Sequence, residues 1–160
     1  MKKIIAFLML GTLLLTTSCS ENKEVIPGKY VTEADDTSIE ITEDGKVSFN
    51  GFDWSVDQEF AELLTCQHLI DSGEIEDTEE ARKKVCDAID VAAQMDGKAN
   101  TYNKVENDEG IVSIYIEIPN SRSNVGFEYI PSDKSLKYSK LIKADPKTFS
   151  NEDIIYTLSK

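Results

Sequence analysis

The chain has 160 residues, with 30 acidic against 17 basic side chains and a formal net charge of −13. So acidic a chain repels nucleic acid, because binding to phosphates needs Lys and Arg to replace counterions, and we therefore exclude nucleic acid as a partner. The length suits one domain with a hydrophobic core and is too short for two comfortable ones.

The first 18 residues have the composition of an export signal. Lys2 and Lys3 precede an apolar run over residues 4–15, and residues 16–18 are small or hydroxylated. A basic start, a short apolar run and small residues before a cleavage point are typical of a secretory signal peptide. The run is shorter than the roughly 20 residues that cross a bilayer, which argues against an uncleaved anchor. We expect residues 1–18 to be removed.

Cys19 follows Ser18 directly, and this junction resembles the lipobox of bacterial lipoproteins. The resemblance implies that the Cys19 thiol is diacylated, with palmitate-type chains, and becomes the new N-terminus. Two acyl chains give stable anchoring where one is marginal. The sequence departs from the lipobox at Thr16, where the family usually has Leu, so an ordinary secretory signal cut at another bond is the alternative. Since Ser20 is not the Asp associated with inner-membrane retention, the resemblance implies the outer membrane, or the outer face of the plasma membrane in a single-membrane host.

Residues 19–26 are mostly polar and predict a short tether, followed by a single β-rich domain over residues 27–160. Because Lys2 and Lys3 leave with the signal, the remainder has a net charge of about −15. Such a charge attracts a cationic partner, such as a basic protein. The alternative is a solvated acidic surface that keeps an exported protein soluble.

The first half of the domain begins with an alternating pattern. Residues 37–42 and 46–52 alternate apolar with polar side chains, and Asp44-Gly45 lies between them. Asp-Gly between two alternating runs predicts a β-hairpin, because Gly accepts the positive φ of the tight turn. Phe52 and Trp54 then come close to Phe49. We expect them to be core residues that join the hairpin to the next segment, with ligand stacking at a barrel mouth as the alternative.

Between residues 55 and 97, the apolar residues recur at the spacing of a helix. Ser55 and Gln58 predict a capping box, and apolar residues follow at helical spacing until Gly73. A second helix is predicted from Asp77-Thr78 to Gly97. The expected apolar stripes are Val56, Phe60, Leu63, Leu64 and Ile70 on the first helix, and Ala81, Val85, Ala88, Ile89 and Ala92 on the second.

If Cys19 bears the lipid, two cysteines remain, Cys66 and Cys86, and both fall near the inner stripe of their helices. An even pair in an exported chain predicts a disulfide, here a staple across the helical hairpin. A metal site formed with His68 is the alternative, which is weak because residues two apart on a helix point to different sides. We therefore predict no metal ion.

Acidic residues concentrate around the turn between the two helices. We expect these side chains to contact a basic partner, namely Glu74, Glu76, Asp77, Glu79 and Glu80. The alternating acids of residues 71–77 are also reminiscent of a calcium loop. Gly73, however, stands at the third place of that segment and not at the sixth, so a solvated turn between helices is the better interpretation.

From residue 99 the chain alternates again. The predicted strands are residues 101–106, 111–118, 125–129, a strand around Leu136 and Tyr138, and 154–158. Val112, Ile114, Ile116 and Ile118 are expected on one face, with Tyr115 on the other. About eight short strands joined by tight turns predict an α+β, mostly β fold: an antiparallel meander or barrel with an inserted helical hairpin.

Gly28-Lys29-Tyr30, followed by an acidic strand, Asp-Gly and another strand, resembles small bacterial lipocalin-like lipoproteins. The resemblance covers the strands, and the helical insertion departs from it. It implies a ligand cavity in the barrel, which the insertion could cap or fill. Fold analogy alone does not identify a ligand.

The sequence has no phosphate-binding glycine loop, no His-Glu-x-x-His and no Cys-x-x-Cys, and its single histidine has no serine elbow to activate. We therefore predict no catalytic residues and no cofactor. The leading hypothesis is a lipid-anchored binding protein of the cell envelope that engages a basic protein, for instance as an inhibitor or immunity protein. The alternative is a lipocalin-like carrier of a small apolar ligand.

Overall fold

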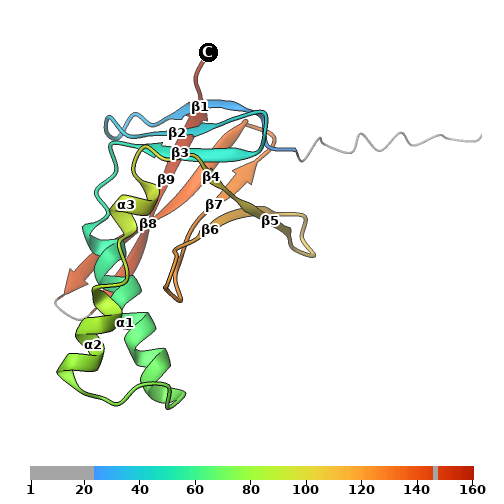
Figure 1. Cartoon of the computed structure of the whole chain (residues 1–160). Coiled ribbons are helices and arrows are strands. Elements are labelled where there is room, and N and C mark those ends of the chain that lie inside the picture. Colours follow the sequence, from blue (N-terminus) through green and yellow to red (C-terminus); the bar gives the residue numbers. More distant parts are fainter. Residues whose placement is uncertain (1–23, 146–147) are drawn as a thin grey trace, which may run out of the picture.

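The structure is a computed structural model that describes residues 24–145 and 148–160 (Figure 1). In these residues, nine antiparallel strands form one strongly curved sheet, a nearly closed barrel, and three helices are inserted after the third strand. The predicted mostly β fold with a helical hairpin is confirmed.

The strands are β1 (Gly28–Val31), β2 (Ser38–Ile41), β3 (Lys46–Asn50), β4 (Asn100–Thr101), β5 (Asn103–Glu106), β6 (Val112–Glu117), β7 (Asn124–Ile130), β8 (Ser135–Asp145) and β9 (Thr148–Leu158). The helices are α1 (Ser55–Asp71), α2 (Glu79–Cys86) and α3 (Val91–Met95).

The two edges of the sheet belong to one continuous segment. The strand order is β4-β3-β2-β1-β9-β8-β7-β6-β5, so β4 and β5 lie at opposite edges although only Tyr102 separates them. Thr101 pairs with Lys46 of β3, whereas Asn103 pairs with Tyr115 of β6. The strand predicted over residues 101–106 is therefore divided at Tyr102, and this division brings the ends of the sheet together.

Side chains fill the interior of the barrel. The alternation of β6 holds, since Val112, Ile114 and Ile116 are all buried and Tyr115 on the other face is only partly so. Tyr30, Phe49 and Tyr156 are among the largest fully buried side chains. These residues form one continuous hydrophobic core with buried residues of α1 and α3. Burial of this apolar surface is the main stabilising contribution to such a fold.

An aromatic cluster joins the barrel to the helical insertion, as predicted for Phe52 and Trp54. The Phe49 ring meets Trp54 edge-on with centroids 5.3 Å apart, and Phe52 stacks on Trp54 at 5.2 Å. Phe52 also meets Tyr138 of β8 edge-on at 5.3 Å. Edge-to-face and offset contacts of this kind are the favoured aromatic geometries. The cluster therefore fixes the position of the residue that precedes α1.

The beginning of α1 differs from the prediction. Trp54 occupies the N-cap position, no side chain caps the helix, and the expected Ser55–Gln58 capping box is absent. Asp53 instead accepts a hydrogen bond from the Ser55 backbone N–H at 2.9 Å. Gln58 is turned toward α3, where its side chain bonds to the Ile89 carbonyl and to the Val91 backbone N–H. The N–H groups of the first helical turn have no partner within the helix, so Gln58 supplies one for Val91. The capping-box prediction was wrong.

The second predicted helix is two helices. Thr78 caps α2 through its side chain, which agrees with the predicted start, but α2 ends at Cys86. The Asp90 side chain then accepts a hydrogen bond from the Ala93 backbone N–H at 2.8 Å and starts α3. Asp is a strong N-cap residue, and here it begins a separate short helix.

The predicted stripe of α1 is also partly wrong. Leu63 and Leu64 are 49% and 39% exposed, whereas the buried residues of α1 are Ala61, Thr65 and Cys66. Figure 1 shows the reason: the later part of α1 projects beyond the barrel together with α2, so only one narrow side of it is covered. We call this projecting part, residues 63–88, the helical protrusion.

The turn between β6 and β7 holds the protrusion against the barrel. The Thr65 hydroxyl accepts a hydrogen bond from the Arg122 backbone N–H at 3.0 Å, and Asn120 donates to the Ala88 carbonyl at 3.0 Å. The same turn is thus bound to α1 and to the link that follows α2. Within residues 24–145 and 148–160, no helix is both long and apolar enough to cross a membrane.

Candidate functional site

All five acidic residues predicted to contact a partner lie exposed on the helical protrusion, in the link before α2 and in its first turn. Two of them are paired locally. Asp77 binds Arg82 at 2.8 Å, and Glu80 binds Lys84 at 2.9 Å. Residues 71–87 contain seven acidic and three basic side chains. The surface is therefore acidic, but the three basic side chains of α2 reduce its net negative charge.

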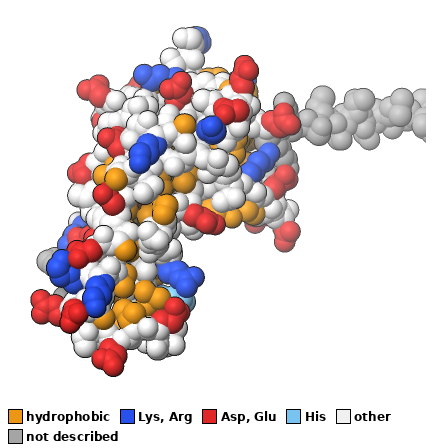
Figure 2. All heavy atoms as spheres, in the orientation of Figure 1, with side chains coloured by type: hydrophobic (Ala, Val, Ile, Leu, Met, Phe, Trp, Pro, Cys, Tyr) orange, Lys and Arg blue, Asp and Glu red, His pale blue; other side chains and the backbone are white. Residues whose placement is uncertain are grey.

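A groove that sequence reasoning missed lies beside these acids, and we call it the protrusion groove. It has a volume of about 620 Å³, and its apolar wall comes from Leu69, Ile75, Ala81, Val85 and Ala88. Glu76, Glu80 and Lys84 also line it, with Asn120 of the β6–β7 turn. Figure 2 shows apolar side chains gathered on the protrusion with charged side chains around them. The groove could not be predicted because it needs three segments that only the fold brings together.

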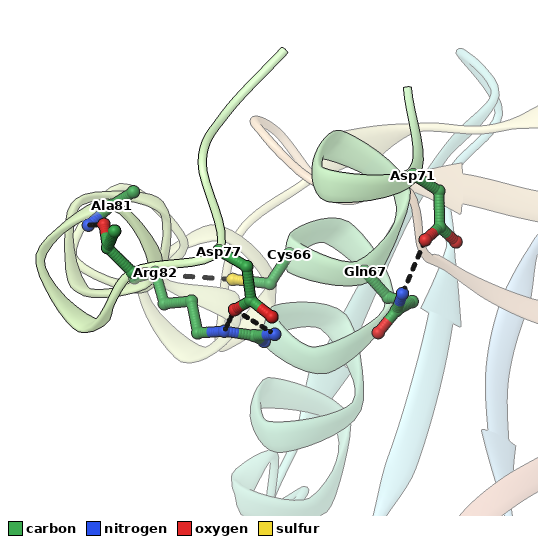
Figure 3. A network of polar contacts seen from close by, with 7 residues as sticks. Cys66, Gln67, Asp71, Asp77, Ala81 and Arg82 are labelled. Carbon is green, nitrogen blue, oxygen red and sulfur yellow. Dashed lines mark hydrogen bonds and ion pairs between the residues drawn. The ribbon is translucent and has the colours of Figure 1, made fainter. Parts of the chain in front are cut away.

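The two cysteines of the predicted pair lie close together between α1 and α2. Figure 3 shows Cys66 of α1 facing Arg82 of α2. Cys66 is buried, Cys86 is partly buried, and both are free thiols. The Cys66 Sγ lies 3.8 Å from the Arg82 carbonyl oxygen. Burial, and next the charge of Glu62, raises the pKa of the Cys86 thiol to about 11. The thiolate is therefore disfavoured, and the predicted disulfide stays a prediction.

His68 is exposed on α1, while Cys66 is buried. Within the described part of the chain, no three His, Cys, Asp or Glu side chains are placed to hold a metal ion. This includes the alternating acids of residues 71–77. The predicted lipidation site, Cys19, lies outside the described residues.

A second groove opens where the sheet splits, and we call it the side groove. The β7–β8 ladder ends at the pair Phe127–Tyr138, whereas β8 continues along β9 to Asp145. The start of α1 lies at this opening and contributes Asp57 and Phe60 to its wall. The volume is about 530 Å³, and further lining residues include Phe127, Tyr138, Ser139 and Phe149.

Two contacts fix the outer wall of the side groove. The Lys143 ammonium binds both carboxylate oxygens of Glu59, at 2.5 and 2.8 Å. The Phe60 and Phe149 rings meet edge-on with centroids 5.3 Å apart. These contacts hold the β8–β9 hairpin against α1, so the outer wall of the side groove is fixed by the fold.

Asp57 is the chemically unusual residue of the side groove. Burial raises the pKa of its carboxyl from 3.8 to about 6, and its own backbone N–H and the charge of Lys140 offset this only in part. Burial, and next the charge of Asp57, raises the pKa of the neighbouring Tyr138 as well. A raised carboxyl pKa in a cleft is a recurring sign of a binding or catalytic position. This role could not be predicted from the sequence, because Asp57 looks like an ordinary first-turn acid of a helix.

Comparison with known proteins gives no relative: no protein-family model, no curated protein and no solved structure matches this chain.

Proposed function

We propose that this chain is a lipid-anchored protein of the cell envelope that binds a basic protein partner through its helical protrusion. The observation on which the proposal rests is the protrusion groove, an apolar groove of about 620 Å³ with Glu76 and Glu80 in its lining. An exposed apolar surface with a charged rim is typical of protein-binding sites. The acidic rim favours a partner segment that has apolar side chains flanked by Lys or Arg.

Anchoring is part of the proposal and comes from the resemblance of the Cys19 junction to a lipobox. Figure 1 supports the arrangement, because the described chain begins beside β1, on the side of the barrel away from the protrusion. A chain held at its N-terminus would direct the protrusion away from the membrane. The location would be the outer membrane, or the outer face of the plasma membrane. An inhibitor or immunity protein that neutralises a basic toxin or lytic enzyme is the concrete form of this function.

The second candidate is a carrier of a small apolar ligand, as the lipocalin-like resemblance implies. The filled interior of the barrel opposes a central ligand cavity, since Tyr30, Phe49 and Tyr156 are fully buried there. Any ligand of that kind has to use a groove outside the barrel core. We therefore prefer the protein-binding function.

The test is a capture experiment with the full chain, solubilised from membranes in detergent. We expect a basic protein that is retained at low salt and released at high salt, because screening weakens an attraction between exposed charges. The double variant Glu76→Lys with Glu80→Lys should lose this protein. Glu33→Lys with Asp36→Lys is the matched control, since it makes the same charge change at exposed positions of the loop after β1. Equal retention by both double variants contradicts the proposal.

A further inference from the structure

The side groove combines a half-buried carboxylate with aromatic walls. Within residues 24–145 and 148–160, no other residue donates a hydrogen bond to the Asp57 side chain or forms an ion pair with it. Its position in the groove lining makes it accessible from the opening. A carboxylate that has lost part of its hydration without gaining a partner is energetically unfavourable, and a cation placed in the groove would remove that cost.

The basic side chains around the groove are engaged elsewhere or too remote to pair with Asp57. Lys143 binds Glu59, and Lys137 binds Glu128. Lys140 lowers the pKa of Asp57 through its charge, after the larger effects of burial and the backbone N–H, and it makes no ion pair with Asp57. Asp53 opposes ionisation of Asp57 still further. Among the described residues, no basic side chain therefore neutralises the Asp57 carboxylate by an ion pair.

The size and the walls of the groove limit what that cation can be. A volume of about 530 Å³ falls within the range of small-molecule sites, roughly 300–1,000 Å³. Phe60, Phe127, Tyr138 and Phe149 offer apolar and aromatic surface, which favours an organic body and attracts cations through the ring faces. Ser139 and Asn151 add hydrogen-bonding groups. A hydrated metal ion fits such walls poorly, because it prefers several oxygen ligands.

We propose that the side groove binds a small organic cation, an amine with an aromatic or aliphatic body, whose ammonium group pairs with the Asp57 carboxylate. This site is separate from the helical protrusion and goes beyond the function proposed above. The raised pKa of Asp57 is consistent with it, since a bound ammonium group would bring that pKa back down.

The probe for the test is 2-phenylethylamine, titrated by calorimetry into the full chain in detergent micelles, with empty micelles as the blank. We expect saturable binding that weakens at least about tenfold in Asp57→Asn, because a hydrogen-bonded charge pair is lost. The neutral analogue 2-phenylethanol should bind the wild-type protein at least about tenfold more weakly than the amine. Asp71→Asn is the matched control, since it removes an exposed carboxylate from the other end of the same helix and should leave the affinity unchanged.

Three results overturn the proposal: no binding of the amine, equal binding of amine and alcohol, or an unchanged affinity in Asp57→Asn. If Asp57→Asn is unstable, Asp57→Ser supplies the same test with a smaller polar side chain. The outcome does not depend on the protein partner, because the capture experiment changes Glu76 and Glu80 and leaves Asp57 in place.

Discussion

Gln58 and Val91 are joined directly although they lie 33 residues apart: the Gln58 side-chain oxygen accepts a hydrogen bond from the Val91 backbone N–H at 2.8 Å. The Gln58 amide nitrogen also donates to the Ile89 carbonyl at 2.7 Å. One side chain thus satisfies both backbone groups at the point where α3 begins, and it fixes α3 against α1.

Replacing Gln58 should therefore destabilise the fold. We expect Gln58→Ala to lower the free energy of unfolding by about 1–3 kcal/mol, because two partly buried backbone groups lose their partners. Urea denaturation followed by circular dichroism measures the change. Gln67→Ala is the control, since Gln67 is exposed and its side chain donates a hydrogen bond to Asp71 on the same helix, and its cost should stay below about 0.5 kcal/mol. Similar losses in both variants would show that the contact to α3 does not matter.

Asp57 should make stability depend on pH. A carboxyl whose pKa is raised from 3.8 to about 6 in the folded state holds a proton there that the unfolded chain has released. Its favourable contribution is complete below about pH 4 and is lost as the pH rises through 6. We expect Asp57→Asn to be more stable than the wild type by about 1–2 kcal/mol at pH 7.5, after allowance for solvent screening, and equal to it near pH 4. A difference between the two proteins that is constant across this range contradicts the assignment.

The two thiols between α1 and α2 should close into a disulfide under oxidising conditions. Cys66 and Cys86 lie near enough to interact electrostatically, which favours their pairing. We expect mass spectrometry after oxidation to find one peptide linking them, and the unfolding free energy to rise by about 3 kcal/mol relative to the reduced protein. Cys86→Ser should abolish both effects. If both cysteines of the oxidised protein are still readily alkylated without reductant, the prediction is wrong.

The Phe49 ring, which is fully buried and in contact with Phe52 and Trp54, should be indispensable to the core. We expect Phe49→Ala to cost about 3–5 kcal/mol, from lost burial and the cavity that it leaves. Thermal unfolding measures the loss. Val105→Ala provides the contrast, because Val105 is 50% exposed on β5 and its truncation should cost less than about 0.5 kcal/mol.

Lipidation can be tested at Cys19. We expect Cys19→Ser to abolish incorporation of labelled palmitate and to release the protein from the membrane fraction, because no acyl chains then hold it. Cys66→Ser keeps the junction intact and should be labelled and anchored like the wild type. Continued labelling of Cys19→Ser would place the acyl chains elsewhere.

The strands were predictable where local pattern decides structure. Asp44-Gly45 forms the expected turn, with Gly45 at φ 74°, and the alternation of β6 correctly gave its buried face. These features depend on neighbouring residues alone. The proximity of Cys66 and Cys86 was also predictable, because the spacing of both residues placed them on facing sides of two helices.

Several of the errors concern contacts between distant segments. Leu63 and Leu64 have apolar character suited to a core, but no element of the barrel reaches them. Gln58 bonds to α3 because the fold offers backbone groups there, and a local pattern cannot show that. The side groove depends on β8 leaving β7 after Tyr138, which is a matter of register between strands.

The division of residues 100–106 at Tyr102 has a consequence for how the molecule opens. Because β4 and β5 complete opposite edges of the same sheet, detachment of this one short segment uncovers two strand edges at once, those of β3 and β6. Uncovered edges are templates for pairing with another chain. The β4 side should detach first, since only two residue pairs hold it against four on the β5 side. Amide hydrogen exchange should thus be faster at Asn100 and Thr101 than along β5, and self-association on mild heating should begin at this seam.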